Sequence, residues 1–253
     1  MEERQILSGA LDIGEQLLIN GAEVYRVEEC IRRICTAYGA KSVDVFTITS
    51  SIVVTMETAE GETLTQTRRI LTYQTDMNRV DLLNGLSREM CCTTMDYDTF
   101  QKKLQAIENS PVFPKWLQFL TYGCVTSAFT IFFGGSWIDG AVSFFVGLAL
   151  YLSVHGAAKA GFNGVISNLV ASFVISFLTI FAVSHHVGES MEMIVIGNIM
   201  PLIPGIGLTN ALRDMISGDT MAGILRFSEA CIMAFAIAAG YILASMALGG
   251  LGL

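Results

Sequence analysis

The sequence predicts a membrane α-helical bundle of about five transmembrane helices, preceded by a small cytoplasmic α/β domain. Hydrophobic residues make up 52% of the 253 residues and charged residues 15%, whereas roughly 25% of a soluble globular chain is charged. The charges are also unevenly placed: residues 1–115 carry 12 Lys/Arg and 17 Asp/Glu, and residues 116–253 carry 3 and 6. We therefore expect a soluble domain, residues 1–112, and a transmembrane domain, residues 113–253.

The N-terminal residues show patterns of both helices and strands. Apolar residues recur at helical spacing in the first 38 residues, and three segments rich in β-branched residues follow. Arg26 is spaced to pair with Glu23 or Glu29 on the second helix. Ser110, Pro111 and Pro114 mark the junction with the membrane domain. The expected elements are helices over 5–20, 22–38, 76–90 and 96–108 and strands over 42–50, 51–58 and 62–70.

Five long uncharged runs follow Lys115, of 23, 19, 29, 20 and 24 residues. A helix needs about 20 apolar residues to cross the hydrocarbon core, so each run is long enough for one crossing and too short for two. Backbone groups in lipid must bond to one another, which favours helices. The expected spans are 116–134, 138–155, 166–184, 192–209 and 222–246, of which the fourth is interrupted by prolines and glycines.

The orientation follows from the positive charges beside the spans. The first 20 residues contain acidic residues and no apolar signal-peptide core, so the N-terminal domain is expected in the cytoplasm. Five crossings then place Lys115, Lys159, Arg213 and Arg226 on the cytoplasmic side and the C-terminus outside. The expected location is the inner (plasma) membrane of a bacterial-type cell.

Several classes of function are excluded by missing residues. The net charge of −8 and the lack of a basic run argue against nucleic-acid binding. His155 is the first histidine, which removes the usual base for a Ser or Cys nucleophile. No Gly-rich phosphate loop or CxxC pair occurs. We therefore predict no enzyme activity, no cofactor and no metal site.

The most unusual segment is PLIPGIGLTNALRDMISGD, residues 201–219. Pro201 and Pro204 remove backbone donors, and Gly205 permits conformations that other residues avoid. Broken helices at membrane depth line protein cavities or water-filled paths. Asn198 and Asn210 would add hydrogen-bonding groups to such a path. The segment is equally compatible with a simple helix end followed by an interfacial Arg213–Asp214 pair.

The same segment resembles the PLIPG…LTN…RD…GD signature of the threonine/serine exporter (ThrE) family. LLINGAEVYRVEE (17–29), TYQTDMNRVDLLNGLSREM (72–90) and FFGGSWIDG (132–140) agree with the family in the same order. The resemblance implies an exporter with a cytoplasmic N-terminal domain followed by membrane helices. Fused members carry a second membrane module, whereas this chain stops at Leu253. It is thus similar to the split form, in which the larger subunit works with a smaller, wholly membranous partner.

The resemblance implies a subunit of a secondary exporter of threonine/serine or of a dicarboxylate such as succinate. The alternative is a membrane-anchored ligand-sensing or scaffold protein without transport of its own. Asp219, a further motif position, is expected to cap the last helix, because Asp219 and Thr220 precede its apolar run. The residues expected to line the transport path are Asn198, Pro201, Pro204, Gly205, Asn210, Arg213, Asp214 and Glu229.

Three of these residues are charged, and each has two readings. Arg213 is expected to meet a substrate carboxylate or to gate the cytoplasmic mouth. Asp214 either pairs with Arg213 or holds a proton. Glu229, inside the last span, is a candidate functional acid because a charge in lipid is costly; alternatively, it pairs with Arg226.

Overall fold

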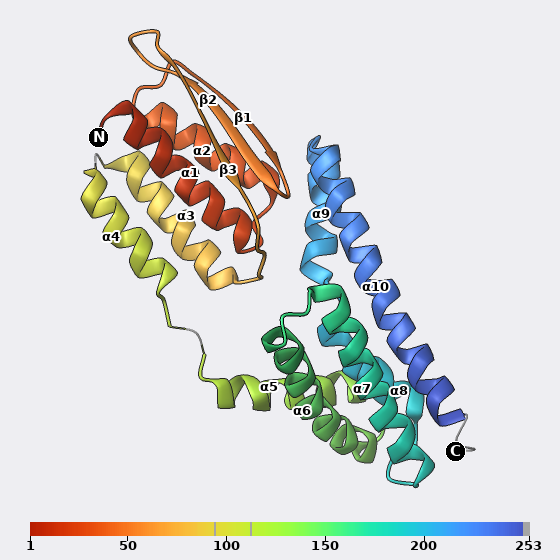
Figure 1. Ribbon diagram of the computed structural model, residues 1–253. Helices are drawn as coiled ribbons and strands as arrows, with labels where there is room; N and C mark the ends of the chain where they lie inside the picture. Colours follow the sequence, from red (N-terminus) through yellow and green to blue (C-terminus); the bar gives the residue numbers. More distant parts are fainter. Residues whose placement is uncertain (94, 112, 250–253) are drawn as a thin grey trace. The chain divides into compact units, whose positions relative to one another are not determined.

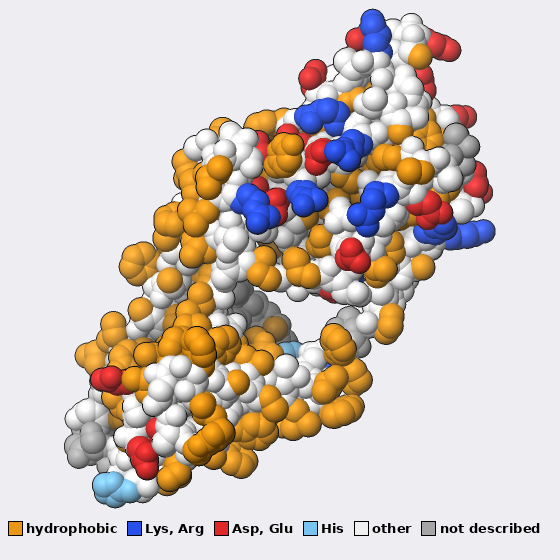
Figure 2. Space-filling model, turned by 180° about the vertical axis from the view of Figure 1, so that it is seen from behind, with side chains coloured by type: hydrophobic (Ala, Val, Ile, Leu, Met, Phe, Trp, Pro, Cys, Tyr) orange, Lys and Arg blue, Asp and Glu red, His pale blue; other side chains and the backbone are white. Residues whose placement is uncertain are grey.

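The computed structural model describes residues 1–93, 95–111 and 113–249. The chain divides into two units (Figure 1). Unit 1 comprises Met1–Pro111 and Ile206–Phe227, and unit 2 comprises Val112–Gly205 and Ser228–Leu253. Figure 2 shows charged side chains over unit 1 and a largely hydrophobic surface over unit 2.

Four helices form most of unit 1. They are α1 (Glu3–Ile19), α2 (Val24–Ala37), α3 (Met77–Cys92) and α4 (Tyr97–Glu108). The Asp76 and Asp96 side chains accept hydrogen bonds from the first turns of α3 and α4, which fixes where these helices begin. The apolar faces of the four helices meet in one core, whose fully buried members include Ile13, Ile31, Leu83 and Phe100.

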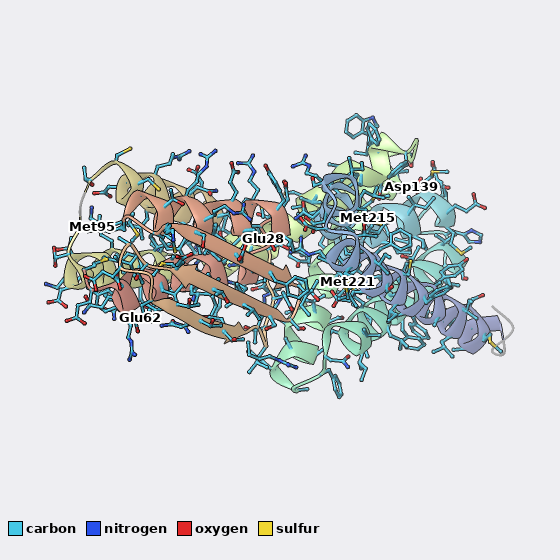
Figure 3. All side chains as sticks on the ribbon, turned by 90° about the horizontal axis from the view of Figure 1, so that it is seen from above. Glu28, Glu62, Met95, Asp139, Met215 and Met221 are labelled. Atoms are coloured by element: carbon cyan, nitrogen blue, oxygen red, sulfur yellow. The ribbon has the colours of Figure 1, made fainter. Side chains whose placement is uncertain are left out.

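A three-stranded antiparallel sheet covers α1 and α2 (Figure 3). Its strands are β1 (Ser42–Ile48), β2 (Ser51–Glu57) and β3 (Thr63–Arg69), in the order β1-β2-β3. Ile52, Val54 and Met56 of β2 alternate inward and are buried. Arg68 of β3 lies opposite Ile52, and its guanidinium pairs with Asp12 of α1 at 2.9 Å.

The helices and strands observed in residues 1–108 match the predicted ranges to within about three residues, as expected for boundary uncertainty. The six cysteines are free thiols. Burial raises the pKa of Cys30 to about 11 and that of Cys35 to about 12. Both thiols therefore stay protonated and act as small apolar side chains.

Unit 2 is a helical bundle built on α5 (Lys115–Phe132), α6 (Trp137–Lys159), α7 (Gly164–Ser184) and α8 (Met191–Ile199). The short 3-10 helix η1 (Met200–Leu202) follows α8, and the end of α10 (Thr220–Gly249) completes the unit. Gly240 of α10 permits close packing on α7, since a Cβ there would lie 2.8 Å from Ser172 Cβ. α10 and α7 are thus in close contact within unit 2.

Three described helices, α6, α7 and α10, are long and apolar enough to cross a membrane. A fourth span results if the interrupted segment formed by Met191–Leu202 and Gly205–Ser217 is counted as one. The 18-residue α5 is not among them. The prediction of a membrane helical protein is consistent with this structure, whereas five crossings remain a prediction.

One feature of the division was not anticipated by the sequence. After η1 the chain resumes as α9 (Gly205–Ser217), and residues 206–227, which include most of α9 and the start of α10, cluster with the N-terminal residues in unit 1. Ala222 is buried in the same core as α1 to α4. The segment that follows the helix interruption therefore belongs structurally to unit 1.

Candidate functional site: a polar seam in unit 2 and a contact at the α1–α2 turn

The interruption predicted between the fourth and fifth spans is present. The helical hydrogen bonding of α8 ends at Ile199, η1 covers Pro201, and α9 begins at Gly205. Proline lacks a backbone donor and its ring clashes with the preceding turn, which explains why the helix stops here. Asn198 lies one turn before the interruption and is fully buried.

Asn198 belongs to a buried set of hydroxyl and amide groups that we call the polar seam, defined as Thr126, Thr130, Ser143, Ser176, Thr179 and Asn198. The Asn198 amide donates to Ser143 Oγ at 2.8 Å and to the Ile194 carbonyl at 2.8 Å. The Thr130 and Ser143 hydroxyls lie 2.7 Å apart. These bonds connect α5, α6 and α8. Ser176 and Thr179 are buried on one face of α7.

Three seam atoms have no hydrogen-bond partner among the described residues: Asn198 Oδ1, Ser176 Oγ and Thr179 Oγ1. A buried polar atom without a partner costs about 1–3 kcal/mol. Such groups are explained by a bound polar molecule, by water or by a functional role. The seam therefore offers free acceptors and donors inside a bundle whose outer surface is apolar.

Two further residues position α8 against the seam. A Cβ on Gly197 would lie 2.7 Å from the Thr130 backbone nitrogen, so only glycine allows α8 to approach α5 this closely. Asp139, at the start of α6, accepts hydrogen bonds from the Glu189 nitrogen at 2.7 Å and the Ser190 nitrogen at 3.1 Å. Figure 3 labels Asp139. The carboxylate ties the loop before α8 to α6, a role that sequence analysis missed because the two segments lie 50 residues apart.

Asp214 of α9 lies in unit 1, at the N-terminus of α2. Its Oδ1 accepts a hydrogen bond from the Val24 nitrogen at 3.1 Å, across 190 residues of sequence. Glu23, the residue that precedes α2, makes no side-chain capping bond, so Asp214 supplies the cap from outside. A carboxylate at this position also interacts favourably with the helix dipole.

Arg226 of α10 completes this contact. Arg226 Nη1 lies 3.4 Å from Asp214 Oδ2, and its Nη2 donates to the Ala22 carbonyl at 2.9 Å. Both side chains are almost completely buried, at 0% exposure for Asp214 and 9% for Arg226. Removing one partner of such a pair leaves a buried charge uncompensated.

Two more residues of the 201–219 segment meet the same turn. Asn210 donates to the Gly21 carbonyl at 2.9 Å, and Arg213 forms an ion pair with Glu23. Gly21 has a φ of +93°, a conformation that favours glycine. Arg26 was expected to pair with Glu23 or Glu29. Instead, Glu23 pairs with Arg213 and Glu29 pairs with Arg33.

The predicted site residues therefore fall into separate groups. Asn210, Arg213 and Asp214 all contact the α1–α2 turn, residues 20–24. This turn lies within residues 17–29, one of the stretches that resemble the family. Asn198 belongs to the seam of unit 2, near Pro201. Pro204 lines an apolar groove of about 520 Å³ with Ala234, Ala238 and Tyr241. Gly205 begins α9, and Glu229 lies at an exposed position of α10.

The model of the family described as "Putative threonine/serine exporter" (ThrE) matches residues 8–249. The chain is 28% identical to the "Probable succinate transporter subunit YjjP" of Klebsiella aerogenes, over 96% of this chain and 94% of that protein. It is 24% identical to the protein of the same name in Escherichia coli K12, again over 96% and 94%.

A third relative is the "Threonine/serine exporter" of Corynebacterium glutamicum, 22% identical over 93% of this chain and 50% of that protein. No solved structure matches the chain. The family comprises transporters rather than enzymes, in agreement with the absence of a catalytic set from the sequence. Because the family model covers nearly the whole sequence, the chain belongs to the ThrE family of threonine/serine exporters.

Proposed function

We propose that this chain is one subunit of a secondary exporter of small carboxylate-bearing metabolites, either threonine and serine or a dicarboxylate such as succinate. Its partner would be a second, smaller and wholly membranous subunit. The coverage of the relatives supports this arrangement: the chain aligns with 94% of two proteins named as transporter subunits and with 50% of a threonine/serine exporter. Family membership leaves the alternative of a sensor or scaffold without support.

The observation that carries the proposal is the polar seam beside the helix interruption. Asn198 is fully buried, and its Oδ1 has no partner in the described part of the chain. The neutral hydroxyl and amide groups of the seam can bind an ammonium or carboxylate without the cost of a fixed charge in lipid. Pro201, Pro204 and Gly205 keep the helix open next to Asn198, as in other transporters with discontinuous helices.

Asn210, Arg213 and Asp214 take a different role in this proposal. They hold the segment after the interruption against the soluble domain through the α1–α2 turn. A movement of that domain would thereby be transmitted to the end of the interrupted helix. Glu229 remains the candidate for a coupling proton, because it is an acid within α10 next to the apolar part of that helix.

The proposed orientation places unit 1 in the cytoplasm and the C-terminus outside the inner membrane. Lys115, Lys159, Arg213 and Arg226 then lie on the cytoplasmic side, as the positive-inside rule favours. The lipid bilayer and a small-molecule substrate are the remaining partners.

The test is export from cells loaded with radiolabelled threonine, serine or succinate. Export of one of these substrates should require this chain together with a short, highly apolar partner expressed beside it. Deleting either gene should abolish the labelled efflux. Unchanged efflux of all three substrates in both deletion strains would refute the proposal.

A further inference from the structure

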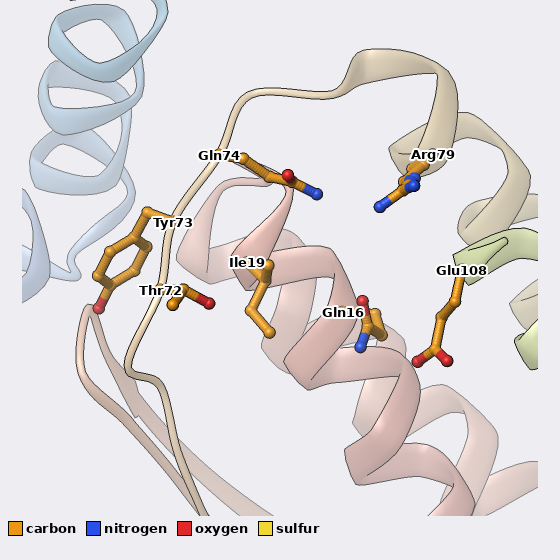
Figure 4. A pocket seen from close by; sticks show the side chains of 7 residues that line it. All are labelled: Gln16, Ile19, Thr72, Tyr73, Gln74, Arg79 and Glu108. Carbon is orange, nitrogen blue, oxygen red and sulfur yellow. The ribbon is translucent and has the colours of Figure 1, made fainter. Parts of the chain in front are cut away.

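Unit 1 contains a polar pocket that the transport proposal does not use (Figure 4). Its volume is about 380 Å³, within the range of about 300–1,000 Å³ typical of small-molecule sites. The segment between β3 and α3 closes one side, and α1, α3 and α4 supply the rest. The lining includes Gln16, Ile19, Thr72, Gln74, Arg79 and Glu108.

Arg79 provides the positive charge of the pocket. It lies in the first turn of α3, where Asp76 Oδ2 is 3.4 Å from its Nε. This Nε is buried and donates no hydrogen bond to any described residue. Figure 4 shows the Arg79 side chain directed into the cavity. A guanidinium that lines a pocket is suited to bind a carboxylate.

The opposite end of the pocket is acidic. Glu108, the last residue of α4, faces the cavity beside Gln16 (Figure 4). Glu15 of α1 adds a second carboxylate near Glu108: burial raises the pKa of Glu15, and the charge of Glu108 raises it further. An ammonium group is favoured here, whereas the second carboxylate of a dicarboxylate would be repelled.

The neutral groups between the two charges are held in place. Gln74 Nε2 donates to Asn20 Oδ1 at 2.7 Å, and the Gln74 nitrogen donates to the Ile19 carbonyl at 2.8 Å. The Asn20 amide in turn donates to the Gln16 carbonyl at 2.7 Å. Asn20 is also the first residue of the α1–α2 turn that contacts Asn210 and Asp214, so the pocket adjoins that contact.

From this arrangement we propose that the pocket binds a free α-amino acid, with its carboxylate on Arg79 and its ammonium on Glu108. The site is separate from the polar seam and would act as a sensor of the cytoplasmic amino acid rather than as part of the transport path. The pocket favours a zwitterion because it presents the Arg79 guanidinium on one side and the Glu108 carboxylate on the other.

The test is equilibrium binding of radiolabelled L-threonine and L-serine to the purified full-length chain in detergent, with succinate as competitor. We expect saturable binding of at least one of the two amino acids, and no competition by a tenfold excess of succinate. Glu108→Gln and Arg79→Gln should each weaken binding at least about tenfold. The matched controls Glu60→Gln and Arg88→Gln, at exposed positions, should bind like the unmodified chain.

Asn198→Ala separates this site from the transport path. Binding that survives Asn198→Ala and is weakened by Glu108→Gln supports the pocket, whether or not the chain exports anything. If Arg79→Gln misfolds because Asp76 loses its partner, the binding measured with Glu108→Gln alone tests the proposal. The proposal is overturned by wild-type affinity in Glu108→Gln, by loss of binding in Asn198→Ala, by effective succinate competition or by no amino-acid binding up to about 10 mM.

Discussion

The two units bury polar groups of different kinds. In unit 1 the buried groups include charges: Asp214 and Arg226 form an ion pair and hold the start of α2. In the described part of unit 2 the buried polar groups are hydroxyls and amides, and Asp139 is the one charged side chain among them. Unit 1 uses charge to join distant segments, while unit 2 uses neutral groups. Each unit contains buried polar atoms without a hydrogen-bond partner among the described residues.

This difference follows from the expected surroundings of the two units. A charge in the hydrocarbon core is costly, whereas hydroxyl and amide groups are tolerated as interhelical contacts. An ion pair outside lipid can be strong when it is buried and well bonded. We therefore expect changes in unit 1 to affect the attachment of α9, and changes in the polar seam to affect transport.

The largest expected effect is on the buried pair. Asp214→Ala leaves Arg226 buried without a counter-charge and removes the cap of α2, so the free energy of unfolding of unit 1 should fall by about 3–5 kcal/mol. Hydrogen exchange of the purified chain should become faster across α9 and the first turn of α2. Asp81→Ala, at an exposed position of α3, is the control. Equal protection in both variants would show that Asp214 does not hold the contact.

A smaller effect is expected in the tightly packed part of unit 2. Gly197→Ala places a methyl group 2.7 Å from the Thr130 backbone nitrogen and should cost about 1–3 kcal/mol. Thermal unfolding in detergent should show a lower midpoint. Gly156→Ala in α6 meets no atom within 4 Å and should leave the midpoint unchanged or raise it. A Gly197→Ala midpoint equal to that of Gly156→Ala would contradict the close α5–α8 packing.

The surface pair of Arg213 and Glu23 should contribute less. The Arg213 side chain is 56% exposed, so solvent screens its charge. A double-mutant cycle with Arg213→Ala and Glu23→Ala should give a coupling free energy of about 0.2–1 kcal/mol that decreases with salt. A coupling free energy above that range that does not change with salt would contradict this prediction. It would mean that the Arg213–Glu23 pair stabilises the fold as strongly as the buried Asp214–Arg226 pair.

The smallest effect is a dependence of stability on pH. Burial raises the pKa of Glu28, and nearby Asp219 raises it further, although the Thr47 nitrogen donates to its carboxylate at 2.8 Å. The folded state therefore holds this proton more tightly than the unfolded state. Stability should be greatest below the unfolded pKa and should decline as pH rises through the raised pKa. Figure 3 labels Glu28 on α2.

Glu28→Gln tests this sign, because glutamine keeps an acceptor for Thr47 and cannot ionise. Unfolding midpoints measured between about pH 4 and pH 8 should decline less steeply in the variant than in the unmodified chain. Glu60→Gln, at an exposed position in the β2–β3 turn, should leave the slope unchanged. A steeper decline in Glu28→Gln would mean that the carboxylate is stabilised by its surroundings.

Local patterns predicted much of the fold. The apolar spacing in α2 and the alternation in β2 follow from contacts within one element and its core, and both were found at the expected positions. Pro201 and Pro204 predicted the helix interruption because proline acts on its own backbone. The prediction of a membrane span is less clear for the first uncharged run, which forms α5. This helix carries no charge after Lys115, but Thr121, Thr126 and Thr130 lower its hydropathy.

Contacts between distant segments could not be predicted in the same way. Asp214 and Val24 lie 190 residues apart, and nothing in the spacing of either segment indicates the other. Arg213 was interpreted as a substrate residue because an isolated arginine beside an uncharged run suggests a charged mouth. The partner that changes this interpretation, Glu23, had been assigned to a pair within α2. The one feature that links the two segments in the sequence is that both lie in stretches that resemble the same family.

Export by an Asn198→Ala variant tests the central claim most directly, namely that the polar seam beside the helix interruption forms the transport path. Cells that contain the chain and its partner would be loaded with the exported substrate, with Asn168→Ala in α7 as the matched control. The account predicts at least a tenfold loss of export, about 1.4 kcal/mol, in Asn198→Ala alone, with equal amounts of all variants in the membrane. Wild-type export by Asn198→Ala would contradict it.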